Sequence, residues 1–241
     1  MVILVGMTKP NFTSINILLD GSGSMERLTN DTIGGVNKFL TDQKALPGEA
    51  ALSIHVFNTK LTPVYDFVPL SNVHPLTKKK YSTHGGTALL DAMGQSIDNL
   101  GTKLSFMKEE DRPSKVLFLI ITDGEENASN LTIEDETVII LQSGDKITKF
   151  ADAKTRLKYP LSRIKEMVSH QRGQYNWEFA FMGANIDAFA DAAAMGMAKG
   201  STLNYTASAA GTADLYANVS QSVTNYRNSG STNNGGFFNN P

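Results

Sequence analysis

Apolar positions along this chain follow two different spacings. Short, continuous apolar runs that end in polar or glycine-rich segments indicate buried strands, whereas apolar residues that recur every three to four positions indicate amphipathic helices. Runs of the first kind cover residues 15–19, 51–57, 61–68, 116–122 and 177–182. Helical spacing covers residues 25–44, 87–104, 161–170, 187–195 and 207–227. Because strands and helices alternate, we predict an α/β fold with a doubly wound, mostly parallel central sheet and helices on both faces.

One pair of the expected strands is antiparallel. Only residues 58–60 separate the strand at 51–57 from the strand at 61–68, which is the spacing of a β-hairpin. Pro63, in the second arm, has no backbone N–H to donate to a neighbouring strand. The second arm is therefore predicted to be an antiparallel strand at one edge of the sheet.

The chain is divided into three parts. We assign residues 1–11 to an N-terminal extension, residues 12–227 to the α/β domain and residues 228–241 to a C-terminal tail. The domain carries an insertion at about residues 137–150, where two β-prone arms flank a Ser-Gly-Asp-Lys turn, and we predict that it forms a β-hairpin. The tail has no charged residue and is rich in Asn, Gly and Ser, so we expect it to be flexible.

Two apolar segments near the ends of the chain have alternative interpretations. Residues 2–5 are either an additional edge strand or residues that precede a true start at Met7. Phe237 and Phe238 either fold back onto the surface of the domain or form a docking motif for a partner. The first behaviour is the more common one for an isolated aromatic pair in a polar tail.

Charge and composition narrow the functional classes. The chain has 22 Lys and Arg residues against 24 Asp and Glu residues, a formal charge of −2, so it has no overall basic field for nucleic acid or an anionic membrane. The absence of cysteine excludes disulfides and thiolate zinc sites and favours a reducing compartment. No window reaches the roughly 18 apolar residues of a membrane span. We therefore expect a cytoplasmic protein without nucleic-acid or membrane partners.

Oxygen-bearing side chains gather where the expected strands and loops lead into helices. Asp20, Ser22 and Ser24 follow the first strand, Thr87 opens a helix after two glycines, and Asp123 follows the most hydrophobic strand. The carboxyl ends of strands in an α/β sheet converge on one crevice, so the three segments can share a site. Two carboxylates and three hydroxyls suit a hard cation rather than zinc or copper. The predicted metal is Mg²⁺ or Mn²⁺, ahead of Ca²⁺.

Each hydroxyl residue of this set has a simpler alternative. Ser22, Ser24 or Thr87, taken alone, could be only the N-cap of the helix that follows it. The metal site is favoured because the residues occur together, in order, and each lies beside an expected strand end or loop.

Neighbouring polar residues are left out of the predicted site. Glu125 and Glu126 are expected to complement a helix dipole or to face solvent. His84 is expected to be an ordinary surface histidine. The three lysines at residues 78–80 are most simply a solvated charge run, with the alternative that they steer an acidic partner toward the Thr87 loop.

The motif D-x-S-x-S, with its downstream partners, resembles a known family. Asp20, Ser22 and Ser24, followed by Thr87 in GGTALLDAM and Asp123 in ITDG, resemble the metal-ion-dependent adhesion site of von Willebrand factor type A domains. The elements occur in the order found in that family. The likeness covers about residues 12–227 and extends to the segments TDGEENAS, WEFAFMGANIDAFADAA and LNYTASAAGT, which resemble small stand-alone bacterial or phage members.

The resemblance implies a Rossmann-like fold and a role for each residue of the motif. Ser22, Ser24 and Thr87 would supply hydroxyl ligands, while Asp20 and Asp123 would bind the metal directly or through water. An open coordination position would then take a carboxylate from a partner protein. The insertion near residues 136–158 departs from the compact members of the family, so the identity of the partner is not carried over.

These observations predict a non-enzymatic protein that binds an Asp or Glu carboxylate of a partner protein through a divalent metal. A cation near helix N-termini that is offset by only two carboxylates retains an affinity for an anion. One alternative is a structural or assembly component, for instance of a phage particle, which would be virion-associated. A metal-dependent phosphohydrolase is less favoured, because Ser22 stands where such an enzyme would need a second Asp, and no phosphate-binding loop or G-x-S-x-G motif is present.

Overall fold

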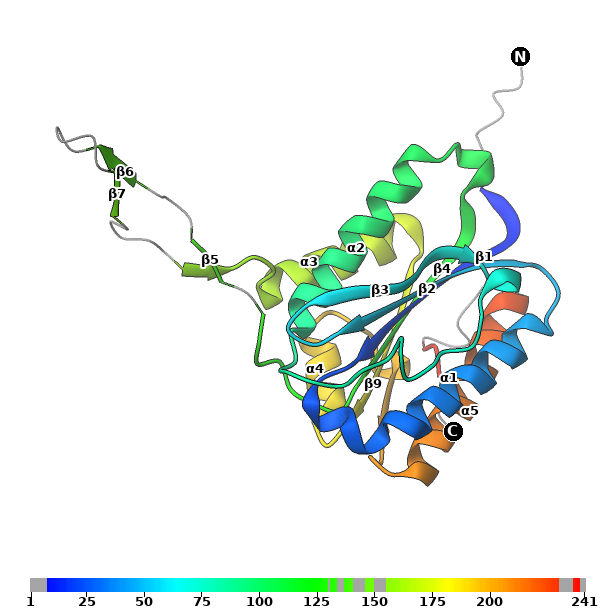
Figure 1. The fold of residues 1–241 in the computed structure, drawn as a ribbon. Coiled ribbons are helices and arrows are strands. Elements are labelled where there is room, and N and C mark those ends of the chain that lie inside the picture. The colour runs from blue at the N-terminus through cyan, green and yellow to red at the C-terminus, as the bar shows by residue number, and fades with distance from the viewer. Residues whose placement is uncertain are drawn as a thin grey trace, which may run out of the picture.

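The computed structural model describes residues 8–129, 131–133, 137–140, 146–149, 155–229 and 236–238. Within these residues the central sheet has six strands in the order β10-β9-β4-β1-β2-β3 (Figure 1). The strands are β1 (Lys9–Asp20), β2 (Glu49–Phe57), β3 (Leu61–Pro69), β4 (Pro113–Thr122), β9 (Glu178–Ala184) and β10 (Thr202–Tyr205). All neighbouring strands are parallel except β2 and β3, so the predicted α/β class with one antiparallel edge strand is confirmed.

Strand β1 lies near the centre of the sheet because both of its faces are apolar. Ile15, Ile17 and Leu19 belong to one hydrophobic core, and Leu18 belongs to the other. β1 pairs in parallel with both β2 and β4. The carboxyl ends of β1 and β4 therefore lie side by side, and this pairing is what brings the end of β1 into contact with the loop that follows β4.

Helices cover both faces of the sheet (Figure 1). α1 (Thr29–Lys44) and α5 (Ala209–Ser229) pack on one face, and α2 (Leu89–Phe106), α3 (Leu161–Tyr175) and α4 (Ala188–Ala194) pack on the other. Short 3₁₀ segments are η1 (Gly23–Leu28), η2 (Leu70–Asn72), η3 (Glu109–Asp111) and η4 (Lys199–Ser201). Among the described helices, none is long and apolar enough to cross a membrane.

The observed elements differ from the predicted ones mainly at their boundaries. β1 begins at Lys9 instead of residue 15, because its first residues are partly exposed and lack the apolar run that marks its buried half. The helix expected over residues 25–44 is divided into η1 and α1, and the Thr29 hydroxyl donates to the carbonyl of Glu26 at 2.8 Å at the junction. Strand β10 was not predicted, since a strand of four residues with a mixed burial pattern gives too short a signal.

The predicted insertion holds one antiparallel strand pair, and a second pair flanks it. β6 (Thr137–Ile140) pairs with β7 (Lys146–Lys149), within the segment expected to form a hairpin. β5 (Leu131–Ile133) pairs with β8 (Thr155–Leu157), a second pair that was not predicted. Residues 141–142 and 150 of the expected arms lie outside the described residues.

Two residues of the expected tail pack against the domain. Phe237 and Phe238 are 5% and 6% exposed, and the Phe237 ring lies 6.2 Å from the ring of Tyr226 in an edge-on arrangement. The N–H of Phe238 donates to the carbonyl of Gly200 at 2.8 Å. Of the two interpretations, this packing favours the one in which the pair folds back. The possible edge strand at residues 2–5 lies outside the described residues.

Candidate metal centre

Three loops bring the candidate ligands together at the carboxyl ends of β1 and β4. The Ser24 hydroxyl donates to Asp123 Oδ1 at 2.5 Å, and the hydroxyl oxygens of Ser22 and Ser24 lie 3.1 Å apart. A Cβ atom built on Gly124 would lie 3.2 Å from Thr87 Oγ1 and 3.6 Å from Ser24 Oγ, so the Thr87 hydroxyl is adjacent to the same cluster. The loops of all three segments thus lie in contact, with Ser22, Ser24, Thr87 and Asp123 close together.

Asp20 is fully buried at the end of β1 and its carboxylate is held on both sides. Oδ1 accepts a hydrogen bond from the N–H of Ser22 at 2.7 Å, and Oδ2 accepts one from the hydroxyl of Thr122 at 2.6 Å. Burial raises the pKa of Asp20; the hydrogen bonds from Thr122 and Ser22 oppose this shift, and the nearby charge of Asp123 adds to it. The two carboxylates therefore repel one another in a buried position, which is an arrangement that a cation between them would relieve.

Asp123 supplies the observation that best tests whether the residues fit a cation. Its side chain is 0% exposed, and Oδ2 has no hydrogen-bond partner. The guanidinium of Arg27 lies 3.9 Å from this oxygen, which is too far for a hydrogen bond. A buried carboxylate oxygen without a partner is costly, and a metal ion is one of the groups that satisfies it. The donor set, oxygen only, fits a hard cation.

The alternative that the hydroxyl residues act as helix caps is not supported for Ser22 or Thr87. Ser22 precedes η1 but makes no side-chain capping bond. At the start of α2, the Glu126 carboxylate accepts the N–H of Leu90 at 2.8 Å and the Ser129 hydroxyl accepts the N–H of Asp91 at 3.1 Å. The loop after β4 therefore caps α2, and the Thr87 hydroxyl is left for another role.

Asn127 and Thr122 support the site and were not identified from the sequence as supporting residues. The Asn127 side chain accepts the N–H of Thr87 at 2.8 Å, and the N–H of Asn127 donates to the carbonyl of Thr87 at 3.0 Å. Thr122 holds Asp20 as described above. Asn127 could have been found from the run ENAS, residues 126–129, which follows Asp123. Its amide and hydroxyl side chains do not precede a helix, so capping a helix that follows them does not explain their presence. Glu126, expected to complement a helix dipole, does so at α2.

Buried tyrosines and glycines fix the backbone behind the ligands. The Tyr81 hydroxyl donates to the carbonyl of Asp20 at 2.7 Å, and the Tyr205 hydroxyl donates to the carbonyl of Thr122 at 3.3 Å. Burial raises the pKa of both hydroxyls, so both stay protonated donors. Gly85 has a φ of +74°, a conformation that disfavours residues with a side chain, and its carbonyl accepts the N–H of Gly23 at 3.0 Å. The loop before α2 is therefore tied to the loop after β1.

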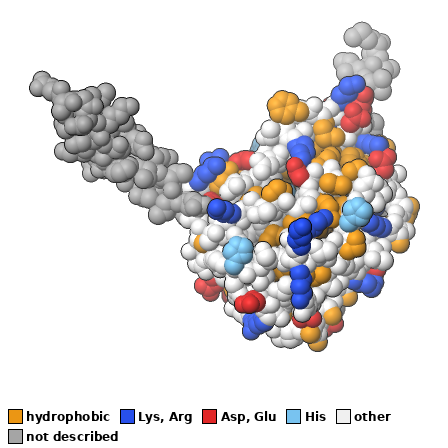
Figure 2. Space-filling view, viewed as in Figure 1, with side chains coloured by type: hydrophobic (Ala, Val, Ile, Leu, Met, Phe, Trp, Pro, Cys, Tyr) orange, Lys and Arg blue, Asp and Glu red, His pale blue; other side chains and the backbone are white. Residues whose placement is uncertain are grey.

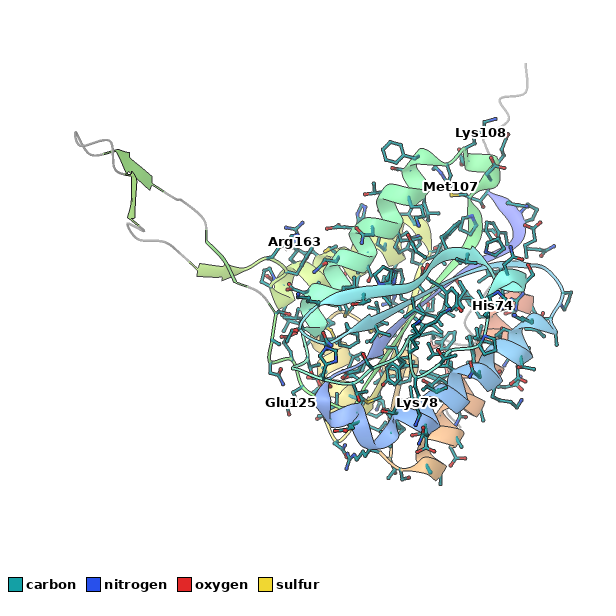
Figure 3. All side chains as sticks on the ribbon, in the orientation of Figure 1. His74, Lys78, Met107, Lys108, Glu125 and Arg163 are labelled. Atoms are coloured by element: carbon teal, nitrogen blue, oxygen red, sulfur yellow. The ribbon has the colours of Figure 1, made fainter. Side chains whose placement is uncertain are left out.

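The cluster of candidate ligands contains two carboxylates, Asp20 and Asp123. Within the described ranges, no group of three or more His, Asp or Glu side chains is arranged to hold a metal ion. Glu125, labelled in Figure 3, is exposed on the loop that follows β4 and makes no part of the cluster. A cation here would be held by two carboxylates and neutral hydroxyls.

Comparisons with known proteins find similarity in structure and not in sequence. No protein-family model matches the chain. No curated protein matches it either. The vWF domain of the type V pili tip protein Mfa5 from Porphyromonas gingivalis has a TM-score of 0.61 at 12% identity, over 90% of this chain and 96% of that one. The pilus adhesin SpaC from Lactobacillus rhamnosus GG has a TM-score of 0.59 at 16% identity, over 90% of this chain and 30% of that one.

A third structure is similar over the same part of the chain. Proximal thread matrix protein 1 from the mussel byssus, in a form with a zinc-occupied metal-ion-dependent adhesion site, has a TM-score of 0.53 at 12% identity. The likeness covers 91% of this chain and 47% of that protein. At these identities the comparisons show the fold alone: the chain has a von Willebrand factor type A fold. It spans nearly all of the Mfa5 domain and less than half of the other two chains.

Proposed function

We propose that Asp20, Ser22, Ser24, Thr87 and Asp123 hold Mg²⁺ or Mn²⁺, and that the bound cation takes an Asp or Glu carboxylate of a partner protein. The observation that carries the proposal is the buried Oδ2 of Asp123, which has no hydrogen-bond partner, on a carboxylate whose Oδ1 accepts the Ser24 hydroxyl. Ser24 is exposed, whereas Asp20 and Asp123 are buried, so the cluster opens to solvent on the Ser24 side.

The charges of the site favour an anionic ligand. A divalent cation supplies a localised positive charge that binds and orients a carboxylate. Two carboxylates would only balance that charge, and the neutral hydroxyls of Ser22, Ser24 and Thr87 add none. The guanidinium of Arg27, 60% exposed beside Asp123, adds a further positive charge. An incoming carboxylate would therefore meet net positive charge.

The residues of the site support binding rather than catalysis. Both oxygens of Asp20 already accept hydrogen bonds from within the protein, and Asp123 Oδ1 accepts one from Ser24. No histidine takes part in the cluster among the described residues. These carboxylates are held as fixed acceptors, whereas a general acid or base must exchange a proton with a substrate.

The second candidate function is a structural or assembly role. It is favoured by the kind of protein that shares the fold: a pilus tip protein, a pilus adhesin and a thread matrix protein. Those proteins belong to extracellular assemblies, so the cytoplasmic location inferred from composition stays a prediction. A metal-bridged contact with a partner's carboxylate would serve either role.

Thermal unfolding tests the metal. A ligand that binds only the native state at a hundredfold excess over its Kd stabilises it by about 2.7 kcal/mol. For a chain of this length that corresponds to a rise of roughly 5–10 °C in Tm. We expect this rise in Mg²⁺ and Mn²⁺ relative to EDTA, its loss in the Asp123→Asn variant, and a smaller rise in the Thr87→Ala variant, which should still fold.

Ser82→Ala is the matched control, because Ser82 is an exposed hydroxyl residue on the loop that carries Thr87. This variant should keep the full shift. Equal Tm values for the native chain in Mg²⁺ and in EDTA would contradict the metal site. Metal-dependent hydrolysis of p-nitrophenyl phosphate that is abolished in Asp20→Ala would overturn the non-enzymatic assignment.

A further inference from the structure

A polar hollow of 280 Å³ lies beside the candidate metal centre. Its lining carries the positive charges of Lys60 and Lys80, the imidazole of His84, and the polar side chains of Asn58, Thr59 and Ser82, with no acidic residue. Lys78, labelled in Figure 3, lies on the same segment before α2, and Figure 2 shows Lys or Arg side chains on this face of the molecule with His side chains set apart from them. We call this hollow the Lys60–Lys80 pocket.

The Lys60–Lys80 pocket shares a wall with the loops that carry the candidate ligands. Gly21, between Asp20 and Ser22, donates its N–H to the carbonyl of Phe57 at 2.7 Å and accepts the N–H of His84 at 2.8 Å. Any Cβ at Gly21 would lie 2.6 Å from Val56 Cγ1, a pocket-lining atom. On the other side, the N–H of Ala88 donates to the carbonyl of Asn58 at 2.8 Å. Both ligand-bearing loops are thus joined to the pocket lining through backbone hydrogen bonds.

Two donors of the pocket, Lys80 and Asn58, are held in place. Lys80 Nζ donates to the Tyr65 hydroxyl at 2.7 Å and lies 4.3 Å from the centre of the Tyr65 ring, which leaves further ammonium protons for a ligand. Asn58 Oδ1 accepts the N–H of Lys60 at 3.0 Å, so the amide nitrogen faces His84 Nε2, 3.2 Å away. In this contact the Asn58 amide donates and the His84 ring nitrogen accepts.

The positive charges of the pocket lack acidic partners. Among the described residues, neither Lys60 nor Lys80 lies within ion-pair distance of a carboxylate, although Lys9, Lys38 and Lys103 each do. A concave surface that contains two unpaired ammonium groups attracts anions. An acidic segment bound at the candidate metal centre would have this surface beside it, because Gly21, between Asp20 and Ser22, contacts the pocket lining.

We propose that the Lys60–Lys80 pocket binds a second carboxylate of the same acidic partner, so that the protein recognises a segment with at least two acidic side chains. The part of this inference that concerns the first carboxylate rests on the proposed function. The pocket itself attracts an anion without the metal. A metal that binds one carboxylate accepts any exposed Asp or Glu, so it discriminates little between partners. A second binding site at a fixed position discriminates among acidic segments.

The test uses an acetylated, amidated hexaglutamate peptide, with acetate as a probe that has one carboxylate. Amide NMR shifts give the Kd of each probe in Mg²⁺ and in EDTA at low salt. An exposed ion pair contributes about 0.2–1 kcal/mol, up to about fivefold in Kd. We expect Lys60→Gln and Lys80→Gln each to weaken hexaglutamate binding about two- to fivefold, and acetate binding in Mg²⁺ to change less.

Lys79→Gln is the matched control, because it removes the same charge from the same lysine run but does not line the pocket. It should leave binding close to that of the native chain. If Lys79→Gln weakens binding as much as Lys80→Gln, only a diffuse field is present and the proposal is overturned. Hexaglutamate that fails to bind in Mg²⁺, or binds with the same Kd to all three variants and the native chain, overturns it as well.

The EDTA measurements separate this proposal from the proposed function. Hexaglutamate should still shift the amides of Lys60 and His84 in EDTA, with a higher Kd. If the lysine effects persist but Mg²⁺ changes neither Tm nor the Kd of either probe, the pocket is supported and the metal-dependent function fails. If Mg²⁺ raises Tm but the lysine variants bind like the native chain, the metal site stands and the pocket proposal fails.

Discussion

The hydrogen bonds that the Glu126 carboxylate accepts allow a test of how the loop after β4 supports the site. One oxygen of its carboxylate accepts the N–H of Leu90 and the hydroxyl of Ser129, each at 2.8 Å. The other accepts the N–H of Ala128 at 3.0 Å and the N–H of Ser129 at 2.8 Å. The perturbation is Glu126→Gln, which preserves the size of the side chain and removes one acceptor oxygen.

The cost of this substitution follows from the arrangement of the donors. Whichever way the glutamine amide turns, its NH₂ group faces at least one backbone N–H, because each carboxylate oxygen accepts one or more of these groups. A hydrogen bond to a charged group contributes about 1.5–3 kcal/mol, and water can replace part of it at this half-exposed position. The substitution also removes a negative charge from the N-terminus of α2. We expect the free energy of unfolding to fall by about 1–2 kcal/mol.

Urea unfolding in EDTA measures this loss without any contribution from bound metal. Glu125→Gln is the control, because Glu125 is the adjacent residue, is exposed and carries the same charge. The control should differ from the native chain by less than about 0.5 kcal/mol. Equal unfolding free energies for the two variants would refute the reasoning, since Glu126 differs from Glu125 in its hydrogen bonds and in its place at the N-terminus of α2.

Two further predictions concern the fold. Phe237→Ala should lower the free energy of unfolding by about 2–4 kcal/mol, because the ring is only 5% exposed. Phe106→Ala, at a side chain that is 87% exposed, is the control and should change it by less than about 0.5 kcal/mol. Equally small changes in both variants would show that the packing of Phe237 contributes nothing to stability. Burial lowers the pKa of His55, with the charge of Asp66 opposing the shift, so the unfolded chain takes up a proton more readily than the folded one. The free energy of unfolding should therefore decline as the pH falls from the ordinary pKa of about 6.5 toward the lowered value, and it should decline less in the His55→Gln variant. Urea unfolding at several pH values measures both, and the same pH dependence in the variant and the native chain would contradict this prediction.

The fold class could be predicted from the sequence because its strongest signals are long and redundant. The run at residues 116–122 is apolar without interruption, as expected for a strand buried on both faces, and it became part of β4. β10 and the β5–β8 pair escaped prediction because three or four residues do not establish a period. Phe237 and Phe238 were ambiguous for another reason: their burial depends on tertiary contact with Tyr226 and Gly200, which no local pattern encodes.

The candidate site could be predicted in part. The oxygen-bearing side chains of Asp20, Thr87 and Asp123 stand out in the sequence because each follows or precedes an element boundary. The structure brings their loops together. Thr122, Asn127 and Tyr81 could not be identified in advance, since each acts through one hydrogen bond to a residue distant in sequence or to a backbone atom.

Hydrogen bonds from the supporting residues can order the three loops without help from a bound cation. Tyr81, Thr122 and Asn127 satisfy backbone or carboxylate groups of the three loops from within the protein, and Glu126 caps α2. The loops therefore have their hydrogen bonds without metal, and the one buried oxygen among the candidate ligands without a hydrogen-bond partner is Oδ2 of Asp123. A cation would then stabilise a site that is already ordered. Because the loops are already fixed by their own hydrogen bonds, little conformational entropy would be lost when the cation binds. If the proposed metal site is correct, EDTA should lower Tm but leave the chain folded, and the proposed partner carboxylate would meet a site whose geometry is set before binding.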